Sequence, residues 1–399
     1  MGECRHRCSF PLKIREGGDE IKTYRLSFKD RIKSIDPILF WCSLAISLLS
    51  LVTLVCGYEV FGARRLIMQL AMTLIGIVII FFIANIDYQE VVDKLYIAMF
   101  LGSVALMAVV ILFGNAIGGN KSWITVFKAG SFEVGIQPSE FVKATFIVSF
   151  SKHLDLVKHK INKIGSIVGL LLHAGIIVGL ILISGDLGVA LVYMGIIAVM
   201  LFCAGLSGWY FLGAGAVVLI AFPFIWDHLQ PYQQERFLAG FNPDLDPLGR
   251  GLHQIVCRRA IANGGVFGKG FSGATVYESL FAADTDCIFA TYCEMFGLIG
   301  AIILMALYVV IIVRIIWIAR SAGKDSGAFI CAGVVGMMLV QTVENIGMNL
   351  CMLPVVGITL PFMSAGGSSV LAIYILFGMV HSVRARKVNY YSERMSDKL

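Results

Sequence analysis

Charged residues are scarce in this sequence: Asp, Glu, Lys and Arg together make up only 15% of its 399 residues. Hydrophobic residues make up 58%, and the mean hydropathy is +0.83. Soluble globular domains carry about 25% charged residues, so this balance excludes that class and indicates a multi-spanning membrane protein. The chain also lacks a long polar linker and an internal repeat. We therefore expect one integral membrane domain over residues 38–384.

Two further absences narrow the interpretation. The first 37 residues hold nine Lys or Arg and six Asp or Glu without an apolar core. This argues against a cleaved signal peptide and predicts a basic cytosolic extension over residues 1–37. The ten cysteines form no CxxC pair and no Cys/His cluster, so we expect them to be small packing residues.

Long apolar runs are what the sequence has in abundance. Ten of them approach the roughly 20 residues that a bilayer-spanning helix needs. They cover residues 39–57, 66–86, 95–113, 138–150, 164–183, 187–204, 209–225, 287–313, 329–350 and 370–380. The fourth and the tenth are short and require extension or tilt. The expected fold is an all-α polytopic membrane protein with about ten transmembrane helices.

Basic residues set the orientation, because cytosolic loops of membrane proteins are enriched in Lys and Arg. With the N-terminus inside, 22 of these residues fall on the inner side and nine on the outer side. Both termini, including a tail over residues 385–399, are therefore predicted to be cytosolic. Three irregular segments are then extracytoplasmic: 115–137, 349–369, and a large loop over 226–286 between helices 7 and 8.

The first outer segment contains several polar candidates. Lys121 and Trp123 lie in "KSWI", and "QPSEFVK" places Gln137 and Glu140 ahead of Lys143. An interfacial Trp and an ordinary helix start explain part of this pattern. Lys143 lies within a predicted span, where an ionisable group is costly and needs a partner or a polar cavity. Glu140, three residues earlier on the same helix face, is the expected partner.

The second outer segment is too long and too patterned to be a simple connector, so we expect it to fold over another part of the protein. Arg258 and Lys269 supply cations near the outer membrane surface. Such cations suit phosphate head groups, and a solvated charge set is the alternative. The stretch "GGVFGKG" is shorter than a phosphate loop and has no Ser or Thr after its Lys, so no nucleotide site is expected.

The ninth predicted span carries a polar stripe, Gln341, Glu344, Asn345 and Asn349, whose spacing of three and four places them on one helix face. A polar stripe in hydrocarbon must face the protein interior. It is followed by "LPVVGITLPFMSAGGSS", whose prolines and glycines forbid a plain helix and predict a re-entrant or surface-lying turn lining a cavity. We expect these outer elements to converge on a crevice and not on a pore.

Two acids, Asp284 and Asp286, flank Thr285 immediately before the eighth span. Short polar side chains at a helix start commonly cap free backbone N–H groups, and the spacing alone favours this structural role. A place in an active-site-like crevice at the outer membrane face is the functional alternative.

Six motifs occur along the chain in a recognisable order. They are "KSWI" with "QPSEFVK", "GDLGVALV", "PYQQERFLAGFNPDLDPLGRGLHQ", "ANGGVFGKGF", "TDCIFATYCEMFGLIG" and "LPVVGITLPFMSAGGSS". From about residue 35 to 387 the sequence resembles the SEDS family (shape, elongation, division and sporulation), whose members polymerise the glycan strands of bacterial peptidoglycan. "SIDPILF" before the first span makes it similar to the RodA-like branch more than to the FtsW-like branch.

This resemblance implies a lipid II glycosyltransferase in the bacterial cytoplasmic membrane, with a class B penicillin-binding protein as partner and no nucleic-acid partner. Asp286 is the implied catalytic carboxylate. It would act as the general base that removes the proton from the acceptor 4-hydroxyl in an inverting transfer. No cofactor is certain from the resemblance. The residues expected to contact substrate are Lys121, Trp123, Gln137, Glu140, Lys143, Arg258, Lys269, Glu294, Glu344, Ser364, Gly366, Gly367 and Ser368.

The sequence departs from the family pattern around the base. Family members usually read "PExHTDFIF", and here Asp284 replaces the His and Cys287 the Phe after the base. A second acid should raise the pKa of the Asp286 carboxyl, and it creates a possible two-carboxylate site, Asp284 and Asp286, for a divalent cation. Glu294 keeps one acid of the usual "GEE", while Met295 replaces the other.

Two other function classes stay open. A flippase for the same lipid-linked precursor needs a polar path through the bilayer, for which Glu140, Lys143, Asp186 and Glu344 are the candidate lining. A non-catalytic scaffold that recruits a transpeptidase would explain the relaxed motif.

Overall fold

The computed structural model describes residues 35–117, 120–129, 132–228, 234, 238, 240–247, 249 and 251–386. Most of the predicted N-terminal extension and C-terminal tail lies outside these residues. Ten of the described helices coincide with the ten predicted apolar runs. They are α2 (Pro37–Cys56), α3 (Tyr58–Asn85), α4 (Tyr88–Phe113), α5 (Pro138–Val157), α6 (Ile164–Ile183), α7 (Leu187–Cys203), α8 (Gly208–His228), α12 (Ile288–Arg320), α13 (Asp325–Asn349) and α14 (Gly367–Ala385).

The two runs that were short in sequence are longer in the structure: α5 has 20 residues and α14 has 19. Seven of the described helices, α2, α3, α4, α6, α12, α13 and α14, are long and apolar enough to cross a membrane, and α7 and α8 have shorter apolar stretches. The all-α polytopic fold class is therefore confirmed. The full number of spans and their orientation stay predictions.

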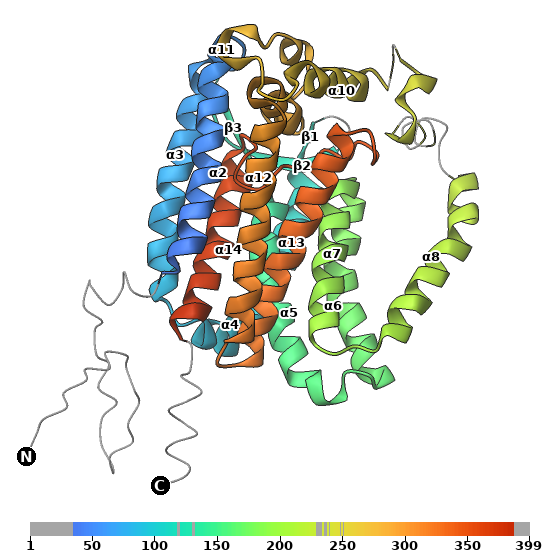
Figure 1. Cartoon of the computed structure of the whole chain (residues 1–399). Helices are drawn as coiled ribbons and strands as arrows, with labels where there is room; N and C mark the ends of the chain where they lie inside the picture. Colours follow the sequence, from blue (N-terminus) through green and yellow to red (C-terminus); the bar gives the residue numbers. More distant parts are fainter. Residues whose placement is uncertain are drawn as a thin grey trace, which may run out of the picture.

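The helices form an elongated bundle in which α3 lies along α14, α13 along α7 and α12, and α4 along α5 (Figure 1). In the same view α8 stands apart at one edge of the bundle, and most of its large apolar side chains are exposed. Exposed apolar faces on long helices are expected where lipid replaces water as the solvent.

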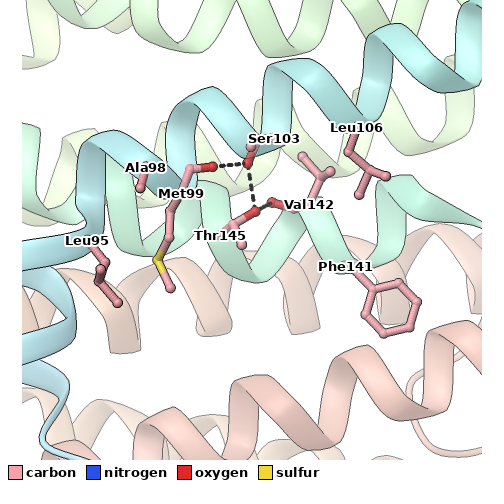
Figure 2. Close-up of a pocket in the computed structure, with 9 residues that line it drawn as sticks. Leu95, Ala98, Met99, Ser103, Leu106, Phe141, Val142 and Thr145 are labelled. Atoms are coloured by element: carbon pink, nitrogen blue, oxygen red, sulfur yellow. Dashed lines mark hydrogen bonds between the residues drawn. The ribbon is translucent and has the colours of Figure 1, made fainter.

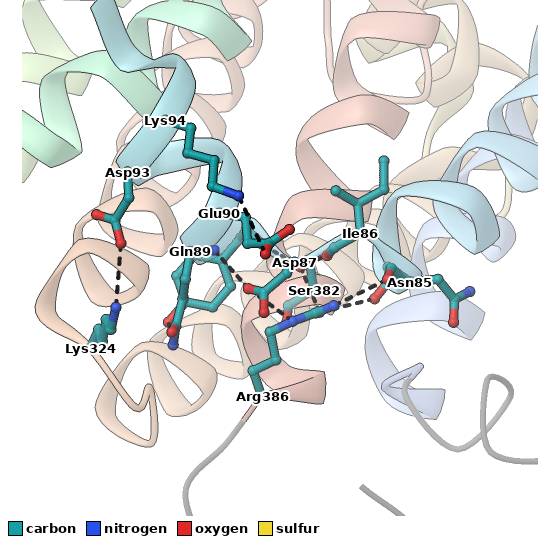
Figure 3. Close-up of polar contacts among 12 residues, drawn as sticks. Asn85, Ile86, Asp87, Gln89, Glu90, Asp93, Lys94, Lys324, Ser382 and Arg386 are labelled. Carbon is teal, nitrogen blue, oxygen red and sulfur yellow. Dashed lines mark hydrogen bonds and ion pairs between the residues drawn. The ribbon is translucent and has the colours of Figure 1, made fainter. Parts of the chain in front are cut away.

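The first and last of the described helices meet at one end of the bundle. Asp36, the N-cap of α2, is fully buried and pairs with Arg314 at 2.7 Å and with Arg384 at 2.9 Å. Beside it, Asp87 pairs with Arg386 at 3.1 Å (Figure 3). The described chain therefore begins and ends on one side of the bundle, as the prediction of two cytosolic termini requires.

The opposite end of the bundle holds a small sheet that the sequence analysis did not predict. Residues expected to be irregular form β1 (Asn115–Ile117), β2 (Asn120–Ala129) and β3 (Phe132–Ile136) in an antiparallel order β1-β2-β3. The aromatic and β-branched residues of "SWITVF" favour a strand. The expectation of an irregular segment was wrong because a search for long apolar runs does not detect strands of mixed polarity.

The loop between α8 and α12 is structured, as expected. Its described residues include helix α10 (Leu252–Gly264), the single turn α11 (Gly270–Gly273) and two 3-10 turns, η2 (Pro243–Leu245) and η3 (Val276–Ser279). Figure 1 shows α10 and α11 at the same end of the bundle as the sheet.

The glycine-rich stretch after α10 docks on a break in α12. Gly297 has a φ of +68°, which interrupts the helix and frees backbone groups. The N–H groups of Leu298 and Ile299 donate to the carbonyls of Gly265 and Val266 at 2.9 and 3.2 Å. A side chain at Gly297 would collide with this backbone, so a glycine is required there. The glycine-rich stretch "GGVFGKG" therefore has a structural role: its backbone pairs with the interrupted backbone of α12.

Candidate active site

Residues 281–287, here called the acidic turn, precede α12 as a series of turns. Neither Asp284 nor Thr285 caps the helix: the N-cap is Cys287, and it makes no side-chain capping bond. The Thr285 hydroxyl instead donates within the turn, to the Ala282 carbonyl at 3.4 Å. The capping prediction was wrong because α12 begins only at Ile288, so neither Asp284 nor Thr285 stands at the N-cap position.

The polar stripe on α13 anchors the acidic turn. The side-chain amides of Asn345 and Asn349 both donate to the carbonyl of Asp286, at 2.9 and 3.1 Å. Asn345 also donates to the carbonyl of Ile358 at 2.8 Å, so one buried side chain joins two irregular segments. The prediction that the stripe faces the protein interior is confirmed for these two residues.

The segment over residues 350–366, here called the Pro/Gly segment, holds the other side of the acidic turn. The Ala365 N–H donates to the carbonyl of Asp284 at 2.8 Å, and the Ser364 hydroxyl donates to that of Thr285 at 2.7 Å. Ser364 in turn accepts from the Leu360 N–H at 2.7 Å. Three consecutive carbonyls of the turn are thus fixed from outside, which determines the direction of the Asp286 side chain.

The Asp286 carboxylate is left without a donor: within the described ranges no hydrogen bond or ion pair reaches it, and its residue is partly exposed. The backbone of the Pro/Gly segment passes beside it, since a Cβ built on Gly357 would lie 3.4 Å from its Oδ2. Burial, with smaller contributions from Asp284 and Asp186, raises the pKa of Asp286 to about 6. A carboxylate with this pKa is ionised at neutral pH and accepts a proton more readily than an ordinary Asp.

Arg65 on α3 is the residue that the sequence analysis missed. Its guanidinium Nε lies 2.9 Å from Oδ2 of Asp284, and its side chain is about half exposed. The acid that replaces the family's His therefore has its own counter-charge, supplied from a distant helix. A divalent cation between Asp284 and Asp286 stays a prediction, and any such ion would compete with Arg65 for Asp284.

Three helix starts adjoin this site. Asp186 caps α7 by accepting from the Val189 N–H at 3.1 Å, and it also accepts from the Gln137 side chain at 3.0 Å. The Gln137 N–H at the start of α5 donates to the Ser368 hydroxyl at the start of α14, at 3.1 Å. Asp186, which the sequence analysis considered only as flippase lining, joins the predicted residues Gln137 and Ser368.

One turn into α5, the expected pair is present. Lys143 Nζ lies 2.8 Å from Glu140 Oε2, and both side chains are almost fully buried. Tyr193 donates to the backbone carbonyl of Ser139 at 2.9 Å and closes the pair from the α7 side. The pairing predicted from the spacing of three is confirmed.

Glu294 has a different environment. Its fully buried carboxylate accepts from the backbone N–H groups of Thr275, Val276 and Tyr277 at 2.8 to 3.0 Å, and from Asn263 at 2.7 Å. Both oxygens are used in holding η3 and the end of α10 against α12. This geometry gives Glu294 a structural task in the outer loop.

The remaining candidates lie around the same end of the bundle. Trp123 packs in the sheet over Gly135, while the side chain of Lys121 is outside the described part. Arg258 on α10 is exposed and pairs with Asp244 at 3.1 Å. The other positions are Lys269, exposed before α11, Glu344, half-buried on α13, and Gly366 and Gly367, where α14 begins.

Two cysteines are more than isolated packing residues. Cys257 Sγ and Cys287 Sγ lie 3.0 Å apart, and His253 Nε2 lies 2.9 Å from Cys287 Sγ. The prediction that the cysteines form no Cys/His cluster was wrong. The signal was present as His253 and Cys257, which are four residues apart on one face of α10, but its third member is distant in sequence.

A cavity of about 330 Å³ lies away from this site, between α4 and α5 (Figure 2). Apolar side chains such as Leu95, Met99 and Phe141 line it, and its polar groups Ser103 and Thr145 bond to each other at 2.7 Å. No charged residue lines this cavity, so it offers no polar path of the kind a flippase needs.

The sequence was compared with known proteins. A sequence model of the FtsW, RodA and SpoVE family, described as cell cycle proteins, matches residues 34–389. "Peptidoglycan glycosyltransferase MrdB" of Escherichia coli (strain K12) is 31% identical over 90% of this chain and 96% of its own length. "Stage V sporulation protein E" of Bacillus subtilis (strain 168) is 34% identical over 81% of this chain and 87% of its own length.

Solved structures agree with the fold. A chain from "Structural coordination of polymerization and crosslinking by a peptidoglycan synthase complex" superposes with a TM-score of 0.77 at 28% identity, covering 89% of this chain and 98% of that one. The Thermus thermophilus Rod shape determining protein RodA superposes with a TM-score of 0.67 at 24% identity over the same shares, which supports the fold alone. Because the family match spans most of the sequence, the chain belongs to the FtsW, RodA and SpoVE family of cell cycle proteins.

Proposed function

We propose that this protein is a peptidoglycan glycosyltransferase that polymerises lipid II at the outer face of the bacterial cytoplasmic membrane. The observation that carries the proposal is the state of Asp286. Its backbone is fixed by Asn345 and Asn349, its carboxylate has no donor within the described ranges, and its pKa is raised to about 6. The "peptidoglycan glycosyltransferase" name of the MrdB relative supports the same chemistry.

In this mechanism Asp286 acts as the general base. The 4-hydroxyl of the acceptor sugar loses its proton to the carboxylate as its oxygen attacks the anomeric carbon of the donor. The bond between that carbon and the undecaprenyl pyrophosphate breaks with inversion, and the pyrophosphate leaves with the electron pair. A positioned base typically contributes about 10²–10⁴-fold to the rate.

The leaving pyrophosphate needs positive charge. Arg65 is suited to this task, because its half-exposed guanidinium uses one edge for Asp284 and keeps further N–H donors. Arg258 and Lys269 are exposed at the same end of the bundle and supply additional charge. Stabilising charge that develops in the transition state is commonly the largest contribution to catalysis.

We further propose a class B penicillin-binding protein as partner, which cross-links the strands made here. The structural neighbour from a synthase complex that couples polymerisation and crosslinking supports such a partner.

The test is an in vitro polymerisation assay on purified lipid II, with and without the partner and divalent cations. We expect Asp286→Ala to lose polymerisation while keeping the melting temperature of the parent chain. The matched control is Glu90→Gln, an exposed acid at the opposite end that pairs with Lys94 at 3.7 Å (Figure 3).

Polymerisation retained by Asp286→Ala would contradict the assignment of the base. A parent chain that moves lipid II across vesicles but forms no glycan under any of these conditions would instead identify a flippase.

A further inference from the structure

We propose that His253, Cys257 and Cys287 form a binding site for a thiolate-preferring divalent metal ion of the zinc class. Cys287 Sγ is central: it lies 3.0 Å from Cys257 Sγ and 2.9 Å from His253 Nε2. All three ligand atoms lie within 4.8 Å of one another. One imidazole and two thiols are the donor types that zinc prefers, and this proposal does not depend on the glycosyltransferase activity.

The fold brings the three groups together from two elements. His253 and Cys257 are four residues apart on α10, so they face the same way, the spacing found for paired metal ligands on helices. Cys287 is the N-cap of α12 and comes from the other side of the contact. Neither element could assemble the site alone.

The burial of its thiols distinguishes this cluster from a chance grouping of side chains on the surface. The thiols of Cys257 and Cys287 are almost fully buried in a small core with Ala260 and Ala283, while His253 is partly exposed. A metal ion would enter past the imidazole. The three protein ligands leave the fourth tetrahedral position to a water molecule.

The distances suit coordination after a small adjustment. Zinc holds sulfur at about 2.3 Å and nitrogen at about 2.0 Å, which separates neighbouring tetrahedral ligands by roughly 3.4–3.8 Å. The two short pairs, Cys257–Cys287 and His253–Cys287, would have to open by less than about 1 Å, and His253 and Cys257 already lie within 4.8 Å of each other. A disulfide is the competing outcome, but it would use only two of the three converging groups and leave the imidazole without its thiol.

Binding is balanced in charge and protons. Both thiols become thiolates and release two protons to solvent, and the two negative charges neutralise the dication while the imidazole stays neutral. The bound ion would tie α10 to the acidic turn, because Cys287 directly follows Asp286 in the chain. A metal here would act as a staple that steadies the turn carrying the proposed base.

The experiment uses the full chain in detergent, reduced and then freed of metal. Cd²⁺ titration should produce thiolate-to-metal absorbance that saturates at one equivalent, and Co²⁺ should produce the visible bands of a tetrahedral site. We expect Cys257→Ser and His253→Gln to lose this step. The matched control, Cys351→Ser, removes a thiol that contacts the same helix through the Gln254 carbonyl at 3.3 Å, and it should bind like the parent chain.

A second measurement needs no variant. In the parent chain, Zn²⁺ should protect two thiols from a maleimide reagent, and a chelator should restore their reactivity. The proposal is overturned if Cd²⁺ absorbance is equal in the parent chain and Cys257→Ser. It is also overturned if Zn²⁺ protects no thiol, or if protein purified without reductant carries a Cys257–Cys287 disulfide.

Discussion

Two aspartates at opposite ends of the bundle, Asp36 and Asp286, have contrasting environments. Asp36 is enclosed by Arg314 and Arg384 and also caps α2. Burial raises the pKa of Asp36, but the hydrogen bond from Arg314 and the nearby positive charges outweigh it and hold that pKa below its usual value. Asp286 has no such partner, and burial raises its pKa to about 6.

This contrast shows what separates a structural acid from a candidate catalytic one. At Asp36 the protein satisfies the carboxylate itself, so the charge serves to join α2, α12 and α14. At Asp286 the described residues satisfy only the backbone carbonyl and leave the carboxylate without a donor. The residue type is the same, but Asp36 is fully buried and surrounded by donors, whereas Asp286 is partly exposed and its carboxylate has no donor among the described residues.

The largest effect on stability should come from breaking the structural acid. Asp36→Ala leaves Arg314 and Arg384 without their partner, and losing one side of a buried pair costs about 3–5 kcal/mol, with the lower end expected because both arginines are about a quarter exposed. Thermal unfolding in detergent measures this. If Asp286→Ala lowered the melting temperature as much as Asp36→Ala does, the comparison between a structural and a candidate catalytic acid would fail.

Glu294 sharpens the comparison, because it is a buried acid at the same end as Asp286 yet has four donors. Glu294→Gln should weaken charge-assisted bonds worth about 1.5–3 kcal/mol and loosen the segment from α10 to η3. Hydrogen exchange of Thr275, Val276 and Tyr277 should accelerate. Unchanged exchange with lost polymerisation would point to a substrate contact at Glu294.

The raised pKa of Asp286 predicts the pH dependence of polymerisation. A base acts in its deprotonated form, so activity should rise with pH through about 6 and level off above 7. Between pH 7 and pH 5 the loss should be about tenfold. Initial rates on lipid II across this range, with stability checked at each pH, provide the measurement. If the polymerisation rate were constant down to pH 5, the pKa of the base would not be raised, and the contrast with Asp36 would be lost.

The smallest effect concerns the neighbouring charges. Asp284→Asn removes a negative charge and should lower the pKa of Asp286, moving the acid limb of the profile to lower pH by less than about one pH unit. Arg65→Gln leaves the negative charge of Asp284 uncompensated, which should raise the pKa of Asp286. The acid limb of the pH profile of this variant should therefore move to higher pH. Shifts of the same sign in both variants would contradict this electrostatic account.

Much of the bundle was predictable because hydropathy is a local property. All ten expected apolar runs are helices, and both short runs lengthened as required. The spacing of Glu140 and Lys143, and of Asn345 and Asn349, was enough to predict a pair and an inward face, because helical periodicity relates residues within two turns. The small sheet was missed because its strands show no strict alternation of apolar and polar residues and pair with one another.

The sequence by itself determined the membrane-spanning class, the family, the polar stripe and the position of Asp286 before an apolar helix. Only the tertiary structure decided how Asp286 differs from its neighbours: that Arg65 neutralises Asp284, and that Glu294 is saturated by loop donors. It also decided that Cys287 meets Cys257. These contacts join residues on different helices, and no local periodicity reports how separate helices pack.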